Sequence, residues 1–188
     1  MIEAEYYGAI DPWYGQFWLI GLGDLAFEGD LKKWVWAGRK PGDALGLVGT
    51  TPGAVAFLCS SDLHRVGLRL CTHLSPVPAD REQWESIGEV SVTFDTPPRL
   101  TNPEDFEPDE TLRCLRIPAG TYRVRAAARG GDAIRKHQNQ ENHDMNCPPL
   151  DIRDRTAPSD LIEQLRIDLW PTTGIEEPST LKPPPAVQ

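Results

Sequence analysis

Residues 115–130 read LRIPAGTYRVRAAARG, and this stretch suggests how the chain folds. From Tyr122 onward, apolar and charged side chains alternate with a period of two, which is typical of a β-strand with one buried face and one face toward water. Residues 111–117 (TLRCLRI) alternate in the same way, and Gly120 between the two runs can adopt the positive φ that a tight reversal requires. We therefore expect a β-hairpin here.

The same alternation recurs along most of the chain. The other windows that show it are 2–8, 14–21, 32–38, 53–60, 65–74, 89–95 and 163–170. Turns rich in Pro, Gly and Asp separate many of these windows. So many short strands predict a mainly β protein, a single-domain two-sheet β-sandwich. One or two short helices are expected, at 78–88 and at 157–165, the second giving way to a strand near Glu163.

The 188 residues can bury one sizeable core, so we expect one domain over residues 1–172. Within it, residues 130–158 are polar, nearly free of aromatic side chains and without periodicity. This composition predicts a long polar excursion. The last residues, 173–188, are rich in proline and poor in apolar side chains, which predicts a flexible tail.

The formal net charge of -9 bears on partners and on location. It disfavours direct binding to nucleic acid, because phosphate contacts depend on Lys and Arg. The first residues lack the basic and apolar regions of an export signal, and no apolar run is long enough for a bilayer, so we expect a cytoplasmic protein without a membrane partner. The cysteines are then expected to be thiols, and they are Cys59, Cys71, Cys114 and Cys147.

The arginines of the expected hairpin concentrate positive charge within an acidic chain. Arg123 and Arg125 alternate with Tyr122, Val124 and Ala126, so the two guanidinium groups share one face of the strand. We expect that face to be exposed to solvent and to pair with acids from EVSVTFD and PEDFEPDE. Recognition of an anionic group is the alternative, although the stretch lacks a glycine-rich phosphate loop.

Side chains that could support catalysis or bind a metal are present without a recognisable arrangement. Residues 137–147 contain His137, His143, Asp144 and Cys147, whose spacing matches no common zinc module. Cys71 and His73 share a strand face, but their apolar run does not offer the exposed electropositive setting that stabilises a thiolate. We therefore expect no metal, no cofactor and no enzymatic activity.

Three stretches in order along the chain carry a resemblance to a known family. They are the early Tyr14-Gly-Gln16-Phe17, the LRIPAGTYRVRAAARG stretch and the closing LRIDLWP. Together they resemble the competence protein J type of nuclease inhibitor and related bacterial immunity-type proteins. The resemblance implies a small cytosolic β-rich bacterial protein that binds and neutralises a nuclease or other toxin, and it implies no catalytic residues.

An acidic segment offers a docking surface for such a partner. Its side chains are Glu104, Asp105, Phe106, Glu107, Asp109 and Glu110. Five carboxylates surround an apolar anchor, an arrangement suited to the basic cleft of a nuclease or basic toxin and to rapid electrostatic association. A solvated connection between two strands is the alternative. Asp151 with Asp154 forms a second, weaker acidic candidate.

Two other classes of function remain open from the sequence. Trp34 and Trp36 would share one face of a strand and could line the groove of a small-ligand or carbohydrate-binding β module. An enzyme of unrecognised type is the third possibility. The gene neighbourhood and the salt dependence of partner binding distinguish these alternatives.

Overall fold

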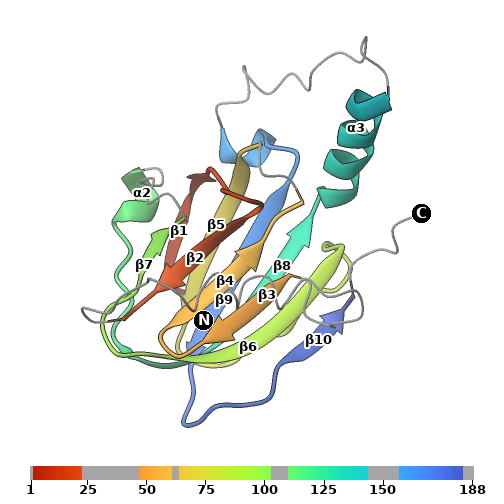
Figure 1. Cartoon of the computed structure of the whole chain (residues 1–188). Coiled ribbons are helices and arrows are strands. Elements are labelled where there is room, and N and C mark those ends of the chain that lie inside the picture. Colours follow the sequence, from red (N-terminus) through yellow and green to blue (C-terminus); the bar gives the residue numbers. More distant parts are fainter. Residues whose placement is uncertain (1, 23–46, 61–63, 103–109, 144–156, 184–188) are drawn as a thin grey trace.

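The computed structural model describes residues 2–22, 47–60, 64–102, 110–143 and 157–183, and side chains of the helix at 131–143 are described through residue 140. The fold is mainly β and consists of two sheets, which confirms the predicted class (Figure 1). The strands are β1 (Ile2–Ile10), β2 (Gln16–Ile20), β3 (Val48–Thr51), β4 (Ala54–Leu58), β5 (Val66–His73), β6 (Ser86–Phe94), β7 (Arg99–Thr101), β8 (Gly120–Arg129), β9 (Gln164–Pro171) and β10 (Ser179–Lys182).

The larger sheet has six strands in the order β1-β5-β9-β8-β6-β10. Its neighbours are antiparallel except for β5 and β9, which run parallel. In that parallel register Cys71 lies opposite Asp168, and in the β6–β8 pair Glu89 lies opposite Arg125. The pairings therefore place polar and charged residues from distant segments side by side.

The core lies between this sheet and the four-stranded sheet, whose order is β3-β4-β2-β7. Phe17 and Phe57 stack at 5.2 Å in the smaller sheet, and Val124 and Ile167 face them from the larger one as members of the same buried cluster. The alternation in β8 sends Val124 and Ala126 into this core, as predicted. Arg123 and Arg125 consequently lie on the outer face, the face of the six-stranded sheet that is turned away from the core.

The predicted hairpin at 111–128 is wrong in its first half. Residues 110–113 form a short helix, α2 (Glu110–Arg113), and the chain runs without regular structure to Gly120. Both edges of β8 are already occupied, by β6 on one side and β9 on the other. No ladder position beside β8 is left for residues 111–117, so the predicted hairpin with β8 does not form.

Two other segments also differ from expectation. The predicted helix at 78–88 is absent, since β6 already begins at Ser86. The polar excursion at 130–158 contains a helix, α3 (Gly131–His143), which extends beyond the end of β8 (Figure 1). Gly130 has φ +82° at the junction, and a Cβ there would lie 1.9 Å from the carbonyl oxygen of Ile162. Only glycine fits this turn, which fixes the start of α3 against the chain entering β9.

Part of the predicted tail at 173–188 has regular structure. Residues 179–182 form β10, which pairs with β6 as the edge strand of the larger sheet. At the other predicted helix, a turn of 3-10 helix at Pro158–Asp160 precedes β9, matching the expected transition near Glu163. Among the helices that the structure describes, none is both long and apolar enough to cross a lipid bilayer.

Candidate functional site

Most residues singled out from the sequence fall outside the described part of the chain. This applies to residues 103–109 of the acidic segment, to Trp34 and Trp36, and to Asp144, Cys147, Asp151 and Asp154. Of the acidic segment, the structure describes Glu110, which begins α2 and is exposed. Helix α2 packs beside β1 and β7, so this end of the segment lies at one edge of both sheets.

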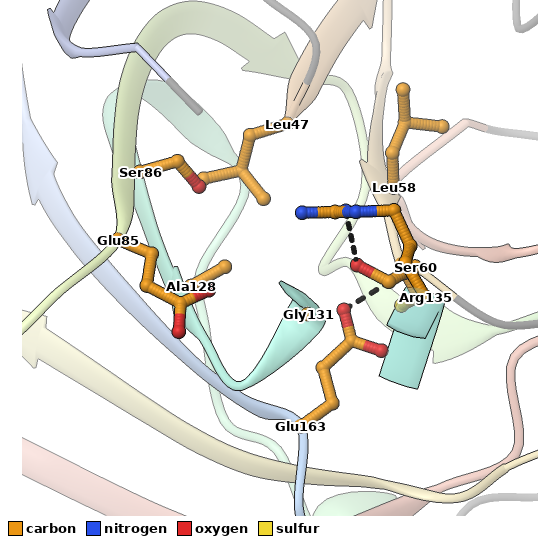
Figure 2. A pocket seen from close by; sticks show the side chains of 10 residues that line it. Leu47, Leu58, Ser60, Glu85, Ser86, Ala128, Gly131, Arg135 and Glu163 are labelled. Carbon is orange, nitrogen blue, oxygen red and sulfur yellow. Dashed lines mark hydrogen bonds between the residues drawn. The ribbon is translucent and has the colours of Figure 1, made fainter. Parts of the chain in front are cut away.

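A polar cavity of about 80 Å³ lies where the start of α3 meets the residues just before β6 and β9 (Figure 2). Glu163 lines it and is 3% exposed. One of its carboxylate oxygens, Oε1, accepts a hydrogen bond of 2.8 Å from the backbone N–H of Ser60, whereas Oε2 has no hydrogen-bond partner. Burial raises the pKa of Glu163, and the hydrogen bonds from Ser60 oppose that rise only in part.

The other charged groups at the cavity are already engaged with the protein. Glu85 accepts a 2.9 Å hydrogen bond from the backbone N–H of Gly130, the residue before α3. Arg135 donates a 2.8 Å hydrogen bond to Oγ of Ser60 and forms an ion pair with Asp132 one turn earlier in the helix. Sequence reasoning did not identify this cavity, because its residues come from four separate segments and form no motif.

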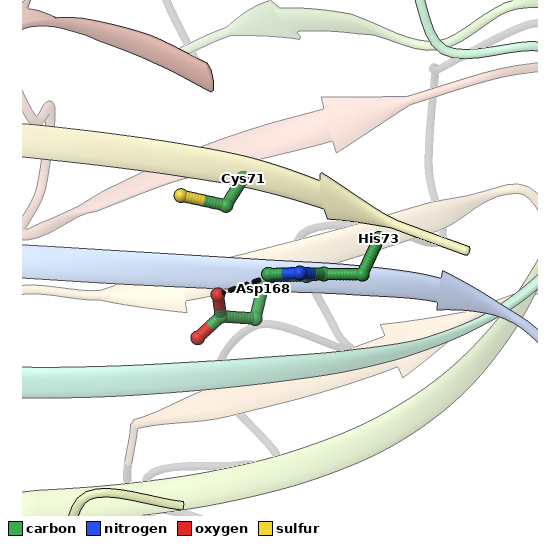
Figure 3. A group of neighbouring side chains, drawn as sticks. All are labelled: Cys71, His73 and Asp168. Carbon is green, nitrogen blue, oxygen red and sulfur yellow. Dashed lines mark hydrogen bonds and ion pairs between the residues drawn. The ribbon is translucent and has the colours of Figure 1, made fainter. Parts of the chain in front are cut away.

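Cys71, His73 and Asp168 form a second cluster, on the outer face of the larger sheet (Figure 3). All three are buried, and one potential metal-ligand atom from each lies within 4.8 Å of the others. His73 Nε2 lies 2.7 Å from Oδ1 of Asp168. The sequence placed Cys71 and His73 on one face but gave no sign of Asp168, which joins them through the parallel β5–β9 register.

The surroundings of this cluster favour a fixed ionic network over reactivity. Burial raises the pKa of the Cys71 thiol, and the negative charge of Asp168 raises it further, so the thiolate nucleophile is disfavoured. Arg166 donates to both carboxylate oxygens of Asp168, at 2.8 and 2.9 Å. A metal ion would have to displace the Arg166 guanidinium from the carboxylate of Asp168. The ion would then lie close to that positive charge, which repels it.

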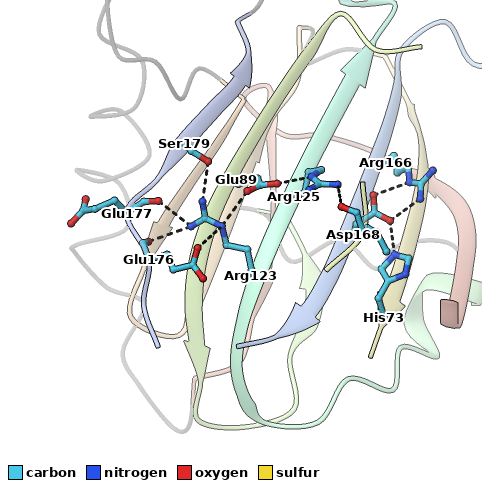
Figure 4. Close-up of polar contacts among 10 residues, drawn as sticks. His73, Glu89, Arg123, Arg125, Arg166, Asp168, Glu176, Glu177 and Ser179 are labelled. Atoms are coloured by element: carbon cyan, nitrogen blue, oxygen red, sulfur yellow. Dashed lines mark hydrogen bonds and ion pairs between the residues drawn. The ribbon is translucent and has the colours of Figure 1, made fainter. Parts of the chain in front are cut away.

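The arginines of β8 form a third polar group on the same outer face (Figure 4). Glu89 accepts hydrogen bonds from Nε of Arg125 at 2.6 Å and from Nε of Arg123 at 3.3 Å. The predicted pairing with an acid of EVSVTFD is therefore confirmed. The predicted exposure is wrong, since Arg123 is 4% and Arg125 8% exposed.

Two chain segments cover these arginines, which explains their burial. Arg125 donates to the carbonyl oxygen of Val77 at 2.8 Å and lies 5.0 Å from the centre of the Trp170 ring. Arg123 donates to the carbonyl oxygens of Glu176 and Glu177 and to the hydroxyl of Ser179 (Figure 4). These bonds occupy the guanidinium donors from within the protein, which argues against the alternative that this face recognises an external anion.

The sequence matches no family model and no curated protein. Two solved structures match the fold. One is ComJ of Bacillus subtilis, described as an inhibitor of the DNA-degrading activity of NucA, with a TM-score of 0.50, 11% identity and coverage of 92% of this chain and 99% of that one. The chain is similar in fold to ComJ. The other is described as crocagin biosynthetic gene J, with a TM-score of 0.49, 14% identity and coverage of 89% and 98%.

The likeness to ComJ confirms, as a likeness of fold, the resemblance first carried by three short stretches of sequence. It spans nearly the whole of both chains, so the likeness concerns the overall fold and not one part of it. At 11% identity the side chains that ComJ uses toward its partner do not carry over to this chain residue by residue.

Proposed function

We propose that this protein is a protein-binding inhibitor, an immunity-type factor that neutralises a nuclease or other basic toxin in the bacterial cytoplasm and catalyses no reaction itself. The observation that carries the proposal is the fold shared with ComJ, an inhibitor of a DNA-degrading nuclease, over 92% of the chain. The clusters of the outer face support it, because their charged side chains are paired within the protein and the Cys71 thiol is buried and disfavoured as a thiolate.

The net charge of -9 supports a basic partner. A nuclease must present positive charge to the phosphates of its substrate, and an acidic protein is steered toward such a surface by long-range attraction. We assign the docking surface to the acidic segment Glu104, Asp105, Phe106, Glu107, Asp109 and Glu110. Support comes from its five carboxylates around one aromatic side chain and from the exposure of Glu110 at the start of α2.

The direct test is a DNA-degradation assay. The purified protein is titrated against NucA and against any nuclease encoded beside its own gene. We expect one of these nucleases to lose activity at a one-to-one ratio, with the apparent affinity falling as salt is raised because the attraction is electrostatic. Full nuclease activity in the presence of a large excess of the protein, for every nuclease tried, would overturn the proposal.

The docking surface is tested by reversing charge within it. We expect the variant Glu104→Lys, Asp105→Lys, Glu107→Lys to slow association with the inhibited nuclease by about tenfold or more, with a smaller change in dissociation. The matched control, Asp80→Lys, Glu82→Lys, Glu177→Lys, reverses as many charges on exposed residues elsewhere. Equal slowing in both variants would show that net charge alone matters and would remove the segment from the interface.

A further inference from the structure

We propose that the cavity lined by Glu163, Glu85 and Arg135 is a binding site for an organic cation, an ammonium or guanidinium group that inserts beside the carboxylate of Glu163. The site is separate from the acidic docking segment, and the inference does not depend on the proposed inhibitor function. Figure 2 shows the carboxylate of Glu163 beside Ser60 and Arg135, with Glu85 across the hollow from them.

The unpartnered oxygen of Glu163 is the first reason for the proposal. A carboxylate that is 3% exposed normally satisfies both oxygens, because an unmade hydrogen bond in the interior costs free energy. Here Oε1 is bonded to Ser60, whereas Oε2 has no donor within the protein. Oε2 is itself shielded from the cavity, so the carboxylate would have to turn toward a cationic N–H group there. That group would then supply both the missing donor and the missing counter-charge.

The balance of charge around the cavity sets the sign of the ligand. Glu163, Glu85 and Asp132 are three potential negative charges, and Arg135 is the facing positive charge among the described residues. That guanidinium is already paired with Asp132 and hydrogen-bonded to Ser60. A net negative pocket attracts a cation, whereas a phosphate or carboxylate ligand would face two unfavourable carboxylates.

The size and the walls of the cavity define the chemical class further. A volume of about 80 Å³ suits a single head group and is too small for a nucleotide or a sugar. Leu47, Leu58 and Ala128 supply apolar walls against which the carbon stem of an alkylammonium or alkylguanidinium can pack. Ser60, Glu85 and Arg135 are half-buried and form the rim, through which the head group would enter.

Ionisation of Glu163 couples this binding to pH. Burial raises its pKa, while a bound cation favours the charged carboxylate, so cation binding should release a proton. The charged groups facing Glu163 are Glu85, which opposes ionisation, and Arg135, which favours it. Binding should therefore tighten as pH rises through the pKa of Glu163 and then level off.

The test is a calorimetric titration with methylguanidinium and with ethylammonium chloride, followed in parallel by amide chemical shifts. We expect saturable binding with shifts at Ser60, Gly130 and Gly131, and at least tenfold weaker binding in Glu163→Gln. That variant keeps an acceptor for Ser60 and should fold. The control Glu82→Gln removes an exposed carboxylate three residues from Glu85 and should bind as the wild type does.

Titrations with inorganic ions test whether the cavity prefers an organic cation. Potassium chloride sets the background, and sodium phosphate and magnesium chloride are titrated in the same way. Tighter binding of phosphate or magnesium than of either organic cation would overturn the inference, as would amide shifts spread over the surface without a change in Glu163→Gln.

A second experiment asks whether the cation is a free small molecule or a side chain of the partner. It measures inhibition of any nuclease that the protein inhibits. Equal inhibition by the wild type and by Glu163→Gln, together with binding of the free organic cations, assigns the site to a small molecule. Weaker inhibition by Glu163→Gln, with Glu82→Gln unaffected, assigns it to a Lys or Arg side chain of the nuclease. If the wild type binds neither organic cation, the proposed cation site is wrong. The proposed inhibitor function is judged separately, by inhibition of the nuclease by the wild type.

Discussion

On β8, both faces of the six-stranded sheet are buried, yet opposite chemistry stabilises them. On β8, Val124 and Ala126 are 0% exposed and face the smaller sheet, whereas Arg123 and Arg125 are 4% and 8% exposed beneath two covering segments. Apolar burial stabilises the first face in proportion to area. The second face is stable only while its charges remain paired, because an unpaired charge in the interior is very costly.

The largest expected effect comes from breaking the charged face at its centre. Glu89→Ala removes the carboxylate shared by Arg123 and Arg125, and we expect it to lower the free energy of unfolding by about 3 to 5 kcal/mol, measured by urea denaturation. Replacing the whole group, Glu89→Leu with Arg123→Met and Arg125→Met, should recover most of the loss. If Glu89→Ala lowers the free energy of unfolding by less than about 1 kcal/mol, the outer face does not depend on the pairing of its charges.

A smaller effect of opposite sign is expected at the cavity. Glu163→Gln keeps the acceptor for Ser60 and removes a charge that burial disfavours, so we expect it to raise the free energy of unfolding at neutral pH by about 1 kcal/mol. The folded pKa of Glu163 is raised, so its stabilising contribution is complete below the unfolded pKa and is lost as pH rises through the folded pKa. The advantage of the variant should therefore grow with pH and then level off.

This pH dependence is measured by repeating urea denaturation across the acidic and neutral range. Glu82→Gln serves as the matched control, because its carboxylate is exposed. If the difference between Glu163→Gln and the wild type does not change with pH, Glu163 does not have the raised pKa that its burial implies.

The smallest effect is expected at the solvent edge of the charged face. The carboxylate of Glu176 lies 4.0 Å from Nε of Arg123, and its side chain is 64% exposed. Because an exposed pair at this distance contributes little, Glu176→Gln should change the free energy of unfolding by less than about 0.5 kcal/mol. A change as large as that of Glu89→Ala would extend the buried network to the surface.

The alternation along each strand was readable from the sequence, whereas the pairing of strands and the covering of faces were not. Alternation placed Val124 in the core and Arg123 opposite it, and charge matching correctly suggested a partner such as Glu89. The alternation also predicted a strand at 111–117, because a local pattern does not reveal that both edges of β8 are occupied by other strands. Local order cannot show which neighbours a strand will have.

The candidate sites follow the same division. Cys71 and His73 share a face by simple periodicity, but Asp168 lies almost a hundred positions further along and reaches them only through the parallel pairing of β5 with β9. Glu163 precedes a strand, and no motif in the sequence marks its carboxylate as buried. Its isolation from water depends on Gly130, whose positive φ sets the start of α3 beside it.

The strand order has a consequence for how the protein is made. β5 and β6 follow one another in the chain, yet in the sheet they are separated by β9 and β8, which are translated much later. The facing edge of β6 can pair with β8 once residue 129 is available, whereas the facing edge of β5 has no neighbour until β9 has been made. Such an open edge invites association between nascent chains. The middle of the larger sheet is therefore completed late, when β9 inserts between β5 and β8, both of which precede it in the chain.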